Sequence, residues 1–326
     1  MTTRTLSTVL LSGLITTTGL MTACGKPAPS SGTGTSASND GTKAPGVFAA
    51  NYALSSFAES IGGDMISVLS PASDGASATN FKPDPEEIIA IQDCRLILLN
   101  GADFSSWVNK ASLPGSRTVR TADGFQDQWL ESNHHHHHDH DHDHQHGPDG
   151  DGVHHHHAHW AAYTWLDPSL AREQARVVGE SLARAFPGDG RAIAERSAAL
   201  DAEFAPLVEQ AKRLSEMTLP TIIAAEPNYG YLARSCGLDL HDADWHWNEP
   251  EPHDGMNSLK ELVEATGATI ILVPETPNSE RAKVLSDLGL DHRVVPLLAD
   301  SPEGVETPFI ESMRSILNTL EGMGSN

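Results

Sequence analysis

Residues 84–100 read DPEEIIAIQDCRLILLN and place a helix directly before a strand. Asp84 is a good helix cap, Pro85 suits the first helical position, and the next two residues put acids in the first turn. Isoleucines continue the helix, and the apolar run that begins at Leu96 is typical of a buried strand. A helix and a strand in this order predict an α/β fold.

The same alternation of short apolar runs and segments of helical periodicity continues along the chain, which at 326 residues is long enough for two domains. This order is typical of parallel sheets wrapped by helices, so we predict two lobes, each a mainly parallel sheet flanked by helices. The predicted strands are 47–51, 66–70, 96–100 and 118–121 in the first lobe, and 221–225, 269–273 and 293–297 in the second. The predicted helices of the second lobe are 258–265, 279–288 and 308–320.

Residues 168–217, between the lobes, are rich in Ala, Arg, Glu and Leu and are interrupted only by Pro-Gly-Asp-Gly at 187–190. Good helix formers with one sharp stop predict two helices, at least one of which connects the lobes. The expected boundaries are 46–165 for the N-terminal lobe, with a His-rich loop at 133–159, then 166–190 for the connecting helix and 191–326 for the C-terminal lobe.

The first 24 residues have the features of an export signal. The apolar stretch from Leu6 to Leu20 is too short and too rich in Thr and Ser to span a membrane. The sequence MTACG at 21–25 resembles a bacterial lipobox, in which Cys24 is lipidated, and ordinary cleavage after Ala23 is the alternative. Residues 25–45 are expected to form a disordered tether. We therefore expect an extracytoplasmic, periplasmic or cell-envelope lipoprotein that contacts the membrane only through its lipid anchor.

The chain is strongly acidic, with 44 Asp and Glu residues against 21 Lys and Arg residues. Nucleic acid and anionic membrane surfaces repel such a chain, so neither is expected as a partner, and cations are the more suitable cargo. Cys94 and Cys236 fall in different predicted lobes beside apolar runs. This placement predicts two buried thiols rather than a disulfide.

Histidine is concentrated in residues 134–159, which hold 14 of the 18 histidines together with five Asp. Imidazole is the commonest protein ligand for zinc, copper and nickel, and a run of imidazoles can form several sites of low specificity. A purification tag does not fit the internal position and the alternation with Asp, so a solvated loop without function is the remaining alternative. The predicted ligands in this tract are His134, His135, His136, His137, His138, His140, His142, His144, His146, His154, His155, His156, His157 and His159.

Several segments resemble the metal-binding solute-binding proteins of ABC importers, the group that handles zinc, manganese and iron. They are FAANY at 48–52, IGGD at 61–64, DGAS at 74–77, FKPDP at 81–85, LNGA at 99–102, WLDP at 165–168 and NYGYL at 228–232. The His-rich tract also lies where zinc-type members carry one, just before WLDP. The resemblance covers nearly the whole chain from residue 47. It implies two lobes joined by a long, stiff helix, with a metal ion held in the cleft between them.

The cleft of this family usually offers three His and one carboxylate, and the resemblance places other residues at all three His positions. Thr79 with Asn80 beside it, Tyr163 and Glu226 fall at these positions, and Glu275 supplies the carboxylate. A set of oxygen donors suits Mn²⁺ or ferric iron better than tetrahedral zinc, which favours imidazole and thiolate.

Three explanations fit this departure. The cleft binds a harder metal through Tyr163, Glu226 and Glu275; or it recruits His246, His253 and the acids around them; or it no longer binds metal and the tract does the work. Each residue also has a structural alternative, because Tyr163 can be a packing aromatic, Glu275 a helix cap, and the two histidines surface residues. An unpaired carboxylate at the end of a very apolar strand is costly, so Glu226 is expected to have a partner or a metal.

The leading function is therefore capture of a divalent transition metal outside the cytoplasm, by a monomer that serves the permease and ATPase of an ABC importer. Zinc is the expected ion, with manganese, iron, nickel and copper as alternatives, and the His-rich tract gathers it. The second hypothesis is a metal-buffering lipoprotein that acts through the tract without a working cleft site. An enzyme is not expected, because the sequence contains no nucleophile elbow, phosphate-binding loop or His-Glu-x-x-His motif.

Overall fold

The computed structural model describes residues 46–71, 77–132, 160–243, 245, 247, 253–301 and 308–324, with only the backbone described at 253–256. The chain divides into two compact units, Met1–Gly41 and Thr42–Asn326, and all the described residues belong to the second unit. The predicted signal and lipidation site at Cys24 therefore lie outside the described residues, as does the predicted tether.

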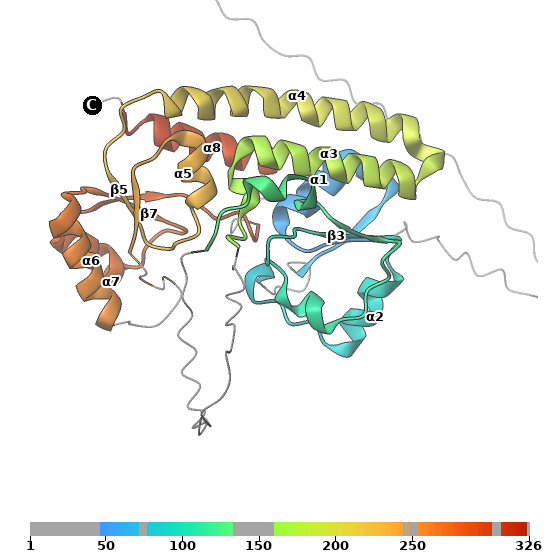
Figure 1. The fold of residues 1–326 in the computed structure, drawn as a ribbon, viewed down its shortest axis with the longest axis horizontal. Helices are drawn as coiled ribbons and strands as arrows, with labels where there is room; N and C mark the ends of the chain where they lie inside the picture. Colours follow the sequence, from blue (N-terminus) through green and yellow to red (C-terminus); the bar gives the residue numbers. More distant parts are fainter. Residues whose placement is uncertain are drawn as a thin grey trace, which may run out of the picture. The chain divides into compact units, whose positions relative to one another are not determined.

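The first sheet contains four parallel strands in the order β2-β1-β3-β4 (Figure 1). They are β1 (Gly46–Ala49), β2 (Ser67–Leu69), β3 (Leu96–Leu99) and β4 (Thr118–Arg120). All four fall within the predicted segments or one residue beyond them. The central strand β3 is buried along its whole length, as expected for a strand covered by helices on both faces.

The helices of the first lobe begin at residues that the sequence marks as caps. Helix α1 (Tyr52–Gly62) starts after Asn51, whose side chain accepts a hydrogen bond from the backbone N–H of Leu54. Helix α2 (Pro85–Asp93) starts at a complete capping box, in which Asp84 accepts from two backbone N–H groups and Glu87 accepts from the N–H of Asp84. These bonds satisfy donors that the first helical turn leaves unpaired, so the predicted helix start is confirmed.

The second sheet repeats the first, with four parallel strands in the order β6-β5-β7-β8. They are β5 (Ile222–Ala224), β6 (Leu240–Asp242), β7 (Ile270–Val273) and β8 (Asp291–Val294). The sequence did not predict β6, and it placed the last strand at 293–297. Both are edge strands with polar, partly exposed residues, so their hydropathy does not separate them from loops.

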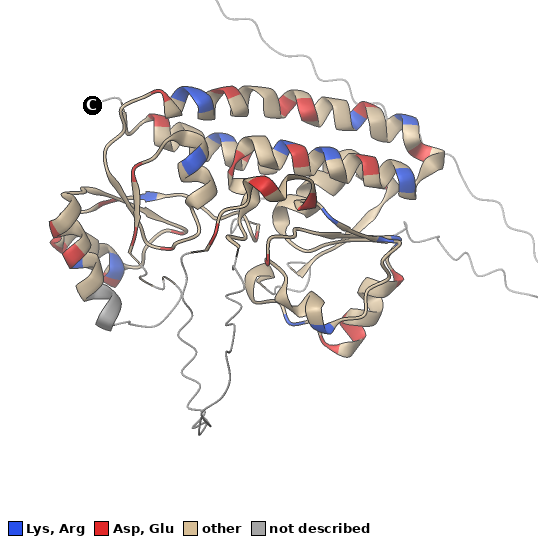
Figure 2. Ribbon diagram, viewed as in Figure 1, with Lys and Arg blue, Asp and Glu red and all other residues tan. Residues whose placement is uncertain are grey.

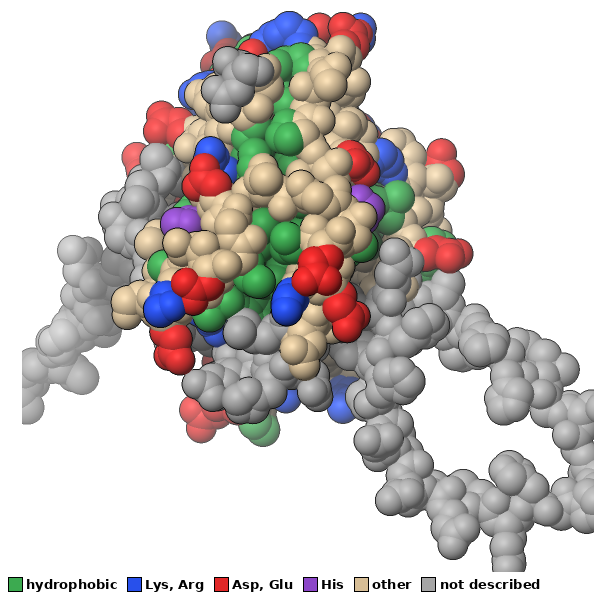
Figure 3. All heavy atoms as spheres, turned by 90° about the vertical axis from the view of Figure 1, so that its left-hand side faces the viewer, with side chains coloured by type: hydrophobic (Ala, Val, Ile, Leu, Met, Phe, Trp, Pro, Cys, Tyr) green, Lys and Arg blue, Asp and Glu red, His purple; other side chains and the backbone are tan. Residues whose placement is uncertain are grey.

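The helices of the second lobe are α5 (Gly230–Cys236), α6 (His253–Thr266), α7 (Ser279–Asp287) and α8 (Phe309–Glu321). In the part of the chain that the structure describes, the only histidine side chains are His241 on β6 and His292 on β8. These strands are opposite edges of the sheet, three strand spacings or roughly 14 Å apart, so the two imidazoles cannot share a metal ion. Histidine side chains also lie apart on the face drawn in Figure 3, where acidic and basic groups are mixed.

Two long helices occupy 168–215, as the composition of 168–217 predicts, and the second of them contacts both lobes. Helix α3 (Pro168–Ala185) turns back at Pro187–Asp189 into helix α4 (Gly190–Ser215), and the two run side by side (Figure 1). Helix α3 packs on α1 and β3 of the first lobe, whereas α4 packs on α1 and also on α5 and α8 of the second. Acidic and basic side chains alternate along both helices (Figure 2).

Aromatic packing joins elements that are far apart in the chain. The Phe57 ring of α1 lies 4.9 Å from the Phe309 ring of α8 and 5.7 Å from the Phe204 ring of α4, centroid to centroid. All three side chains are at most 1% exposed, and they belong to one hydrophobic core that includes residues of both sheets. This shared core explains why the two lobes form one compact unit.

The two remaining cysteines behave as predicted, since Cys94 and Cys236 are both buried and free. Burial raises the pKa of the Cys236 thiol to about 12, so this group is an uncharged core residue at neutral pH. Among the described residues, no helix has both the length and the apolar composition that crossing a membrane requires.

Candidate metal site

The segment 163–167 is fixed between the lobes by contacts in both directions. Trp165 donates its indole N–H to the Leu297 carbonyl of the second lobe at 2.8 Å. Asp167 caps α3 and also pairs with Arg234 of α5 at 3.1 Å. Thr164, fully buried, donates its hydroxyl to Gln174 or Asn100 of the first lobe. These contacts hold Tyr163, the predicted ligand, at the junction of the lobes.

Tyr163 is itself buried, with 6% of its surface exposed, and it packs against Phe104 and Trp165 at ring distances of 6.0 and 5.1 Å. Its hydroxyl lies 3.5 Å from the hydroxyl of Thr79, at the limit of a hydrogen bond. Tyr163 therefore packs as a buried aromatic residue and also makes a polar contact through its hydroxyl. Asn80, next to Thr79, is exposed and makes no described contact with Tyr163.

Asp300 of the second lobe joins this group. Its Oδ1 accepts a hydrogen bond from the Ala78 backbone N–H at 2.6 Å, and its Oδ2 accepts one from the Ser77 hydroxyl at 2.8 Å. The Ala78–Asn80 turn that carries Thr79 is thereby held against the second lobe. Two residues earlier, the buried Leu298 has a left-handed backbone (φ 55°), an unfavourable conformation that shapes the turn leading to Asp300.

The electrostatic surroundings of Tyr163 are negative. Burial raises the pKa of the Tyr163 hydroxyl to about 12; the hydrogen bond with Thr79 lowers it, and the charges of Glu226 and Asp300 raise it further. The pKa of Tyr229 is raised well above its ordinary value by burial first, and then by Glu226 and Tyr163. Two carboxylates thus act on one buried phenol, and a region of this kind attracts a cation.

Glu226 follows the fully buried strand β5, at its carboxyl end. One of its oxygens, Oε1, accepts a hydrogen bond from the Trp247 backbone N–H at 2.7 Å. Glu275 follows the neighbouring strand β7 and accepts a hydrogen bond from the Trp247 indole N–H at 3.1 Å. Both predicted acids therefore leave the sheet at the same edge, and Trp247 lies between them.

The structure places the hydroxyls of Thr79 and Tyr163 in contact and holds Asp300, which the sequence did not predict, against the turn that carries Thr79. The charge of Glu226 also raises the pKa of Tyr163. The signal for Asp300 was present, because it lies beyond the carboxyl end of a parallel strand, as Glu226 does. Glu275 is connected to Glu226 through Trp247. In the described part of the chain, no three His, Cys, Asp or Glu side chains are close enough to hold a metal by themselves. The group around Tyr163 offers hydroxyl and carboxylate oxygens.

The histidines predicted as ligands are outside what the structure describes. The tract from His134 to His159 falls in the undescribed segment 133–159, and His246 is also undescribed. His253 begins α6, but its side chain is not described.

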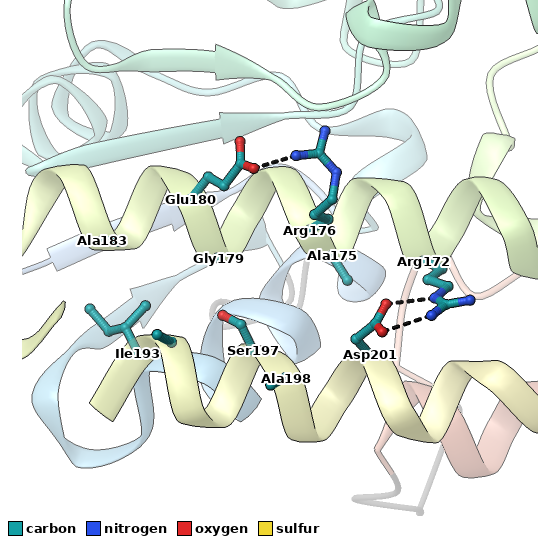
Figure 4. Close-up of a pocket in the computed structure, with 11 residues that line it drawn as sticks. Arg172, Ala175, Arg176, Gly179, Glu180, Ala183, Ile193, Ser197, Ala198 and Asp201 are labelled. Carbon is teal, nitrogen blue, oxygen red and sulfur yellow. Dashed lines mark hydrogen bonds and ion pairs between the residues drawn. The ribbon is translucent and has the colours of Figure 1, made fainter. Parts of the chain in front are cut away.

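A surface cavity of about 460 Å³ lies elsewhere, between α3 and α4 (Figure 4). Small residues line it, and Gly179 allows the close approach of the helices, because a Cβ there would lie 2.4 Å from the Ser197 hydroxyl. Its charged rim is paired, Arg172 with Asp201 and Arg176 with Glu180. Paired charges over a floor of small residues give this cavity no set of metal donors.

Acids beyond the carboxyl ends of parallel strands are where open α/β sheets bind their ligands. The family model ZnuA, described as zinc-uptake complex component A, periplasmic, matches residues 47–323. The chain belongs to this family and is a metal-binding periplasmic component of ABC metal uptake. Members of the family are transport binding proteins and not enzymes, which agrees with the prediction from the sequence.

Individual relatives agree with this assignment at low sequence identity. A protein of Treponema pallidum (strain Nichols) whose name assigns it to metal binding is 23% identical over 280 residues, which is 82% of this chain and 83% of the relative. The fold is similar to that of the metal-dependent lipoprotein YcdH from Bacillus subtilis (TM-score 0.69, 18% identity, 86% of this chain and 99% of the other). It is equally similar to the Zn(II)-bound ZnuA-like domain of AdcA from Streptococcus pneumoniae (TM-score 0.68, 18% identity, 87% and 100%).

Proposed function

We propose that this protein captures a divalent transition metal, zinc first among them, and passes it to the permease and ATPase of an ABC importer. The observation that supports the proposal is the group at Tyr163. Thr79 of the first lobe contacts the phenol hydroxyl, Asp300 of the second lobe holds the turn that carries Thr79, and the charges of Glu226 and Asp300 act on the phenol. An ion bound there bridges the lobes, so its capture is coupled to the contact between them.

Zinc is supported by the family and by the Zn(II)-bound relative, whereas the oxygen donors at Tyr163 also accept manganese or iron. Nickel and copper are alternatives for the imidazole tract. The charges of Glu226 and Asp300, which both act on Tyr163, support cation binding of either kind.

The His-rich tract supplies ions to this site in the proposed function. Its two ends are joined, because Glu131 and Trp160 form an antiparallel bridge and the Ala161 N–H donates to the Leu130 carbonyl at 2.8 Å. The Leu130 N–H in turn donates to the Tyr231 hydroxyl of α5 at 3.0 Å. Of the residues that flank the tract, Trp160 is close in sequence to Tyr163, and Leu130 is in contact with Tyr231 of the second lobe.

Two further features complete the proposal. Lipidation at Cys24 and the tether 25–45 hold the protein at the outer side of the cytoplasmic membrane, and it acts as a monomer. Both are expectations that are tested by labelling with a fatty-acid analogue in cells and by light scattering of the purified protein.

Deletion of residues 134–159 tests whether the junction itself binds metal. The chelator-stripped deletion protein is titrated with Zn²⁺ against a competing chelator, and one tight ion per chain is expected. Glu226→Ala in the deletion background removes this binding. Asp201→Asn, which changes an exposed acid on α4, is the matched control and leaves it unchanged.

The alternative function, metal buffering through the tract alone, predicts a different outcome. All tight binding then disappears with residues 134–159, and Glu226→Ala in the full chain has no effect. The concentration of 14 histidines in the tract is the observation that supports this alternative.

A further inference from the structure

Trp247 makes two polar contacts with two different acids. Its backbone N–H donates to Glu226 at 2.7 Å, and its indole N–H donates to Glu275 at 3.1 Å. The side chain is 1% exposed, and the guanidinium of Arg281 lies 4.7 Å above the indole ring. A buried tryptophan with both N–H groups bound to acids is fixed in position as well as in orientation.

Ala243 and Trp245, the described residues just before Trp247, are bonded to the carboxyl end of β5 and the residue after it. Ala243 N–H donates to the Ala224 carbonyl at 2.8 Å, and Trp245 N–H donates to the Ala225 carbonyl at 3.3 Å. The rings of Trp245 and Trp247 meet edge to face at 5.4 Å. Trp247, whose backbone N–H holds Glu226, is therefore close in sequence to two residues bonded at the end of β5, and its own indole is bonded to Glu275.

The two acids differ in their surroundings. Glu226 is half-buried at the end of the buried strand β5, whereas Glu275 is exposed. Glu275 accepts from the indole of Trp247, and Glu226, which accepts from the Trp247 backbone, is the acid taken to bind the ion in the proposed function.

From this geometry we infer that Trp247 is a positioning residue for Glu226, and that Glu275 acts through the Trp247 indole rather than as a ligand of the metal. The inference rests on the proposed function, since Glu226 is the residue taken to bind the ion. An acid held by a fixed N–H presents its carboxylate in one orientation, so less conformational entropy is lost when the ion binds.

Variants of Glu275 in the protein lacking 134–159 separate the two roles. Glu275→Gln keeps an oxygen that accepts from the indole, and its Zn²⁺ affinity is expected to stay within about threefold of the parent, because the exposed charge is screened. Glu275→Ala and Trp247→Phe each remove the indole bond and lower the affinity about tenfold. The double variant is no weaker than either single variant, because both remove the same bond. Glu264→Ala, an exposed acid on α6 of the same lobe, is the control and leaves the affinity unchanged.

A readout that does not depend on metal accompanies the titration. The Trp247 indole N–H resonance, assigned by its absence in Trp247→Phe, is expected to shift in Glu275→Ala and to stay near its position in Glu275→Gln. Because Glu275 is exposed, its variants are expected to fold even where Trp247→Phe does not.

The outcomes separate the inference from the function beneath it. Equal losses of affinity in Glu275→Gln and Glu275→Ala identify Glu275 as a ligand and overturn the inference. The inference is also overturned if the protein lacking 134–159 binds zinc tightly but its Trp247 indole resonance does not shift in Glu275→Ala. If the protein lacking 134–159 binds no metal, the proposed function is contradicted. The positioning role of Trp247 is then contradicted as well, even if the indole resonance shows the bond between Trp247 and Glu275.

Discussion

Asp300 accepts a hydrogen bond of 2.6 Å from the backbone N–H of Ala78, across the junction of the two lobes. The same carboxylate adds negative charge at Tyr163. One side chain thus connects the turn that carries Thr79 to the second lobe and contributes to the proposed metal site. A residue in both roles links metal binding to the contact between the lobes.

Replacing Asp300 separates these roles. Asp300→Ala loses the bonds to Ala78 and Ser77, and it is expected to lower the free energy of unfolding by about 1 to 2 kcal/mol, measured by urea denaturation of the metal-free protein. Asp300→Asn keeps an acceptor for the Ala78 N–H and is expected to lose less stability. Both variants lose tight zinc binding in the protein lacking 134–159. Retention of that binding in either variant would exclude Asp300 from the site.

Tyr163 offers a test of the donor type. Tyr163→Phe retains the packing against Phe104 and Trp165 and removes the hydroxyl, so the fold is expected to persist while affinity for a hard ion such as Mn²⁺ falls. Tyr163→His introduces an imidazole, and zinc affinity is expected to rise at least about tenfold relative to manganese. Both affinities are measured by chelator competition. Unchanged affinities in both variants would mean that Tyr163 is only a packing residue.

The two proposed binding regions differ in their response to pH. Only neutral imidazole binds metal, and its ordinary pKa is about 6.5, so zinc held by the tract is present above this pH and is released as the pH falls through it. The protein without residues 134–159 is expected to keep its single ion over the same range. Bound zinc per chain, measured for both proteins from about pH 7.5 to about pH 5.5, checks this difference. Parallel loss from both proteins would place imidazole in the junction site as well.

Elements with strong local signals could be predicted from the sequence. The helix at Pro85 begins with a capping box that four consecutive residues encode, and the strand at Leu96 is an uninterrupted apolar run. Strand β6 carries no such signal, because Leu240, His241 and Asp242 pair with a buried strand only through the backbone at a sheet edge.

The site was harder to predict because its contacts are distant in sequence. Asp300 and Ala78 are separated by 222 positions, and no local pattern indicates that they meet. Glu275 and Asp300 both lie beyond the carboxyl ends of parallel strands, so the sequence alone does not tell which acid faces Tyr163.

The most direct measurement is an anomalous difference map at the zinc absorption edge, from crystals of the protein lacking 134–159 grown with Zn²⁺. A single strong peak in contact with Glu226 and Asp300 beside Tyr163 is the predicted result. A map with no peak at this junction, from a protein shown by elemental analysis to carry zinc, would contradict the account.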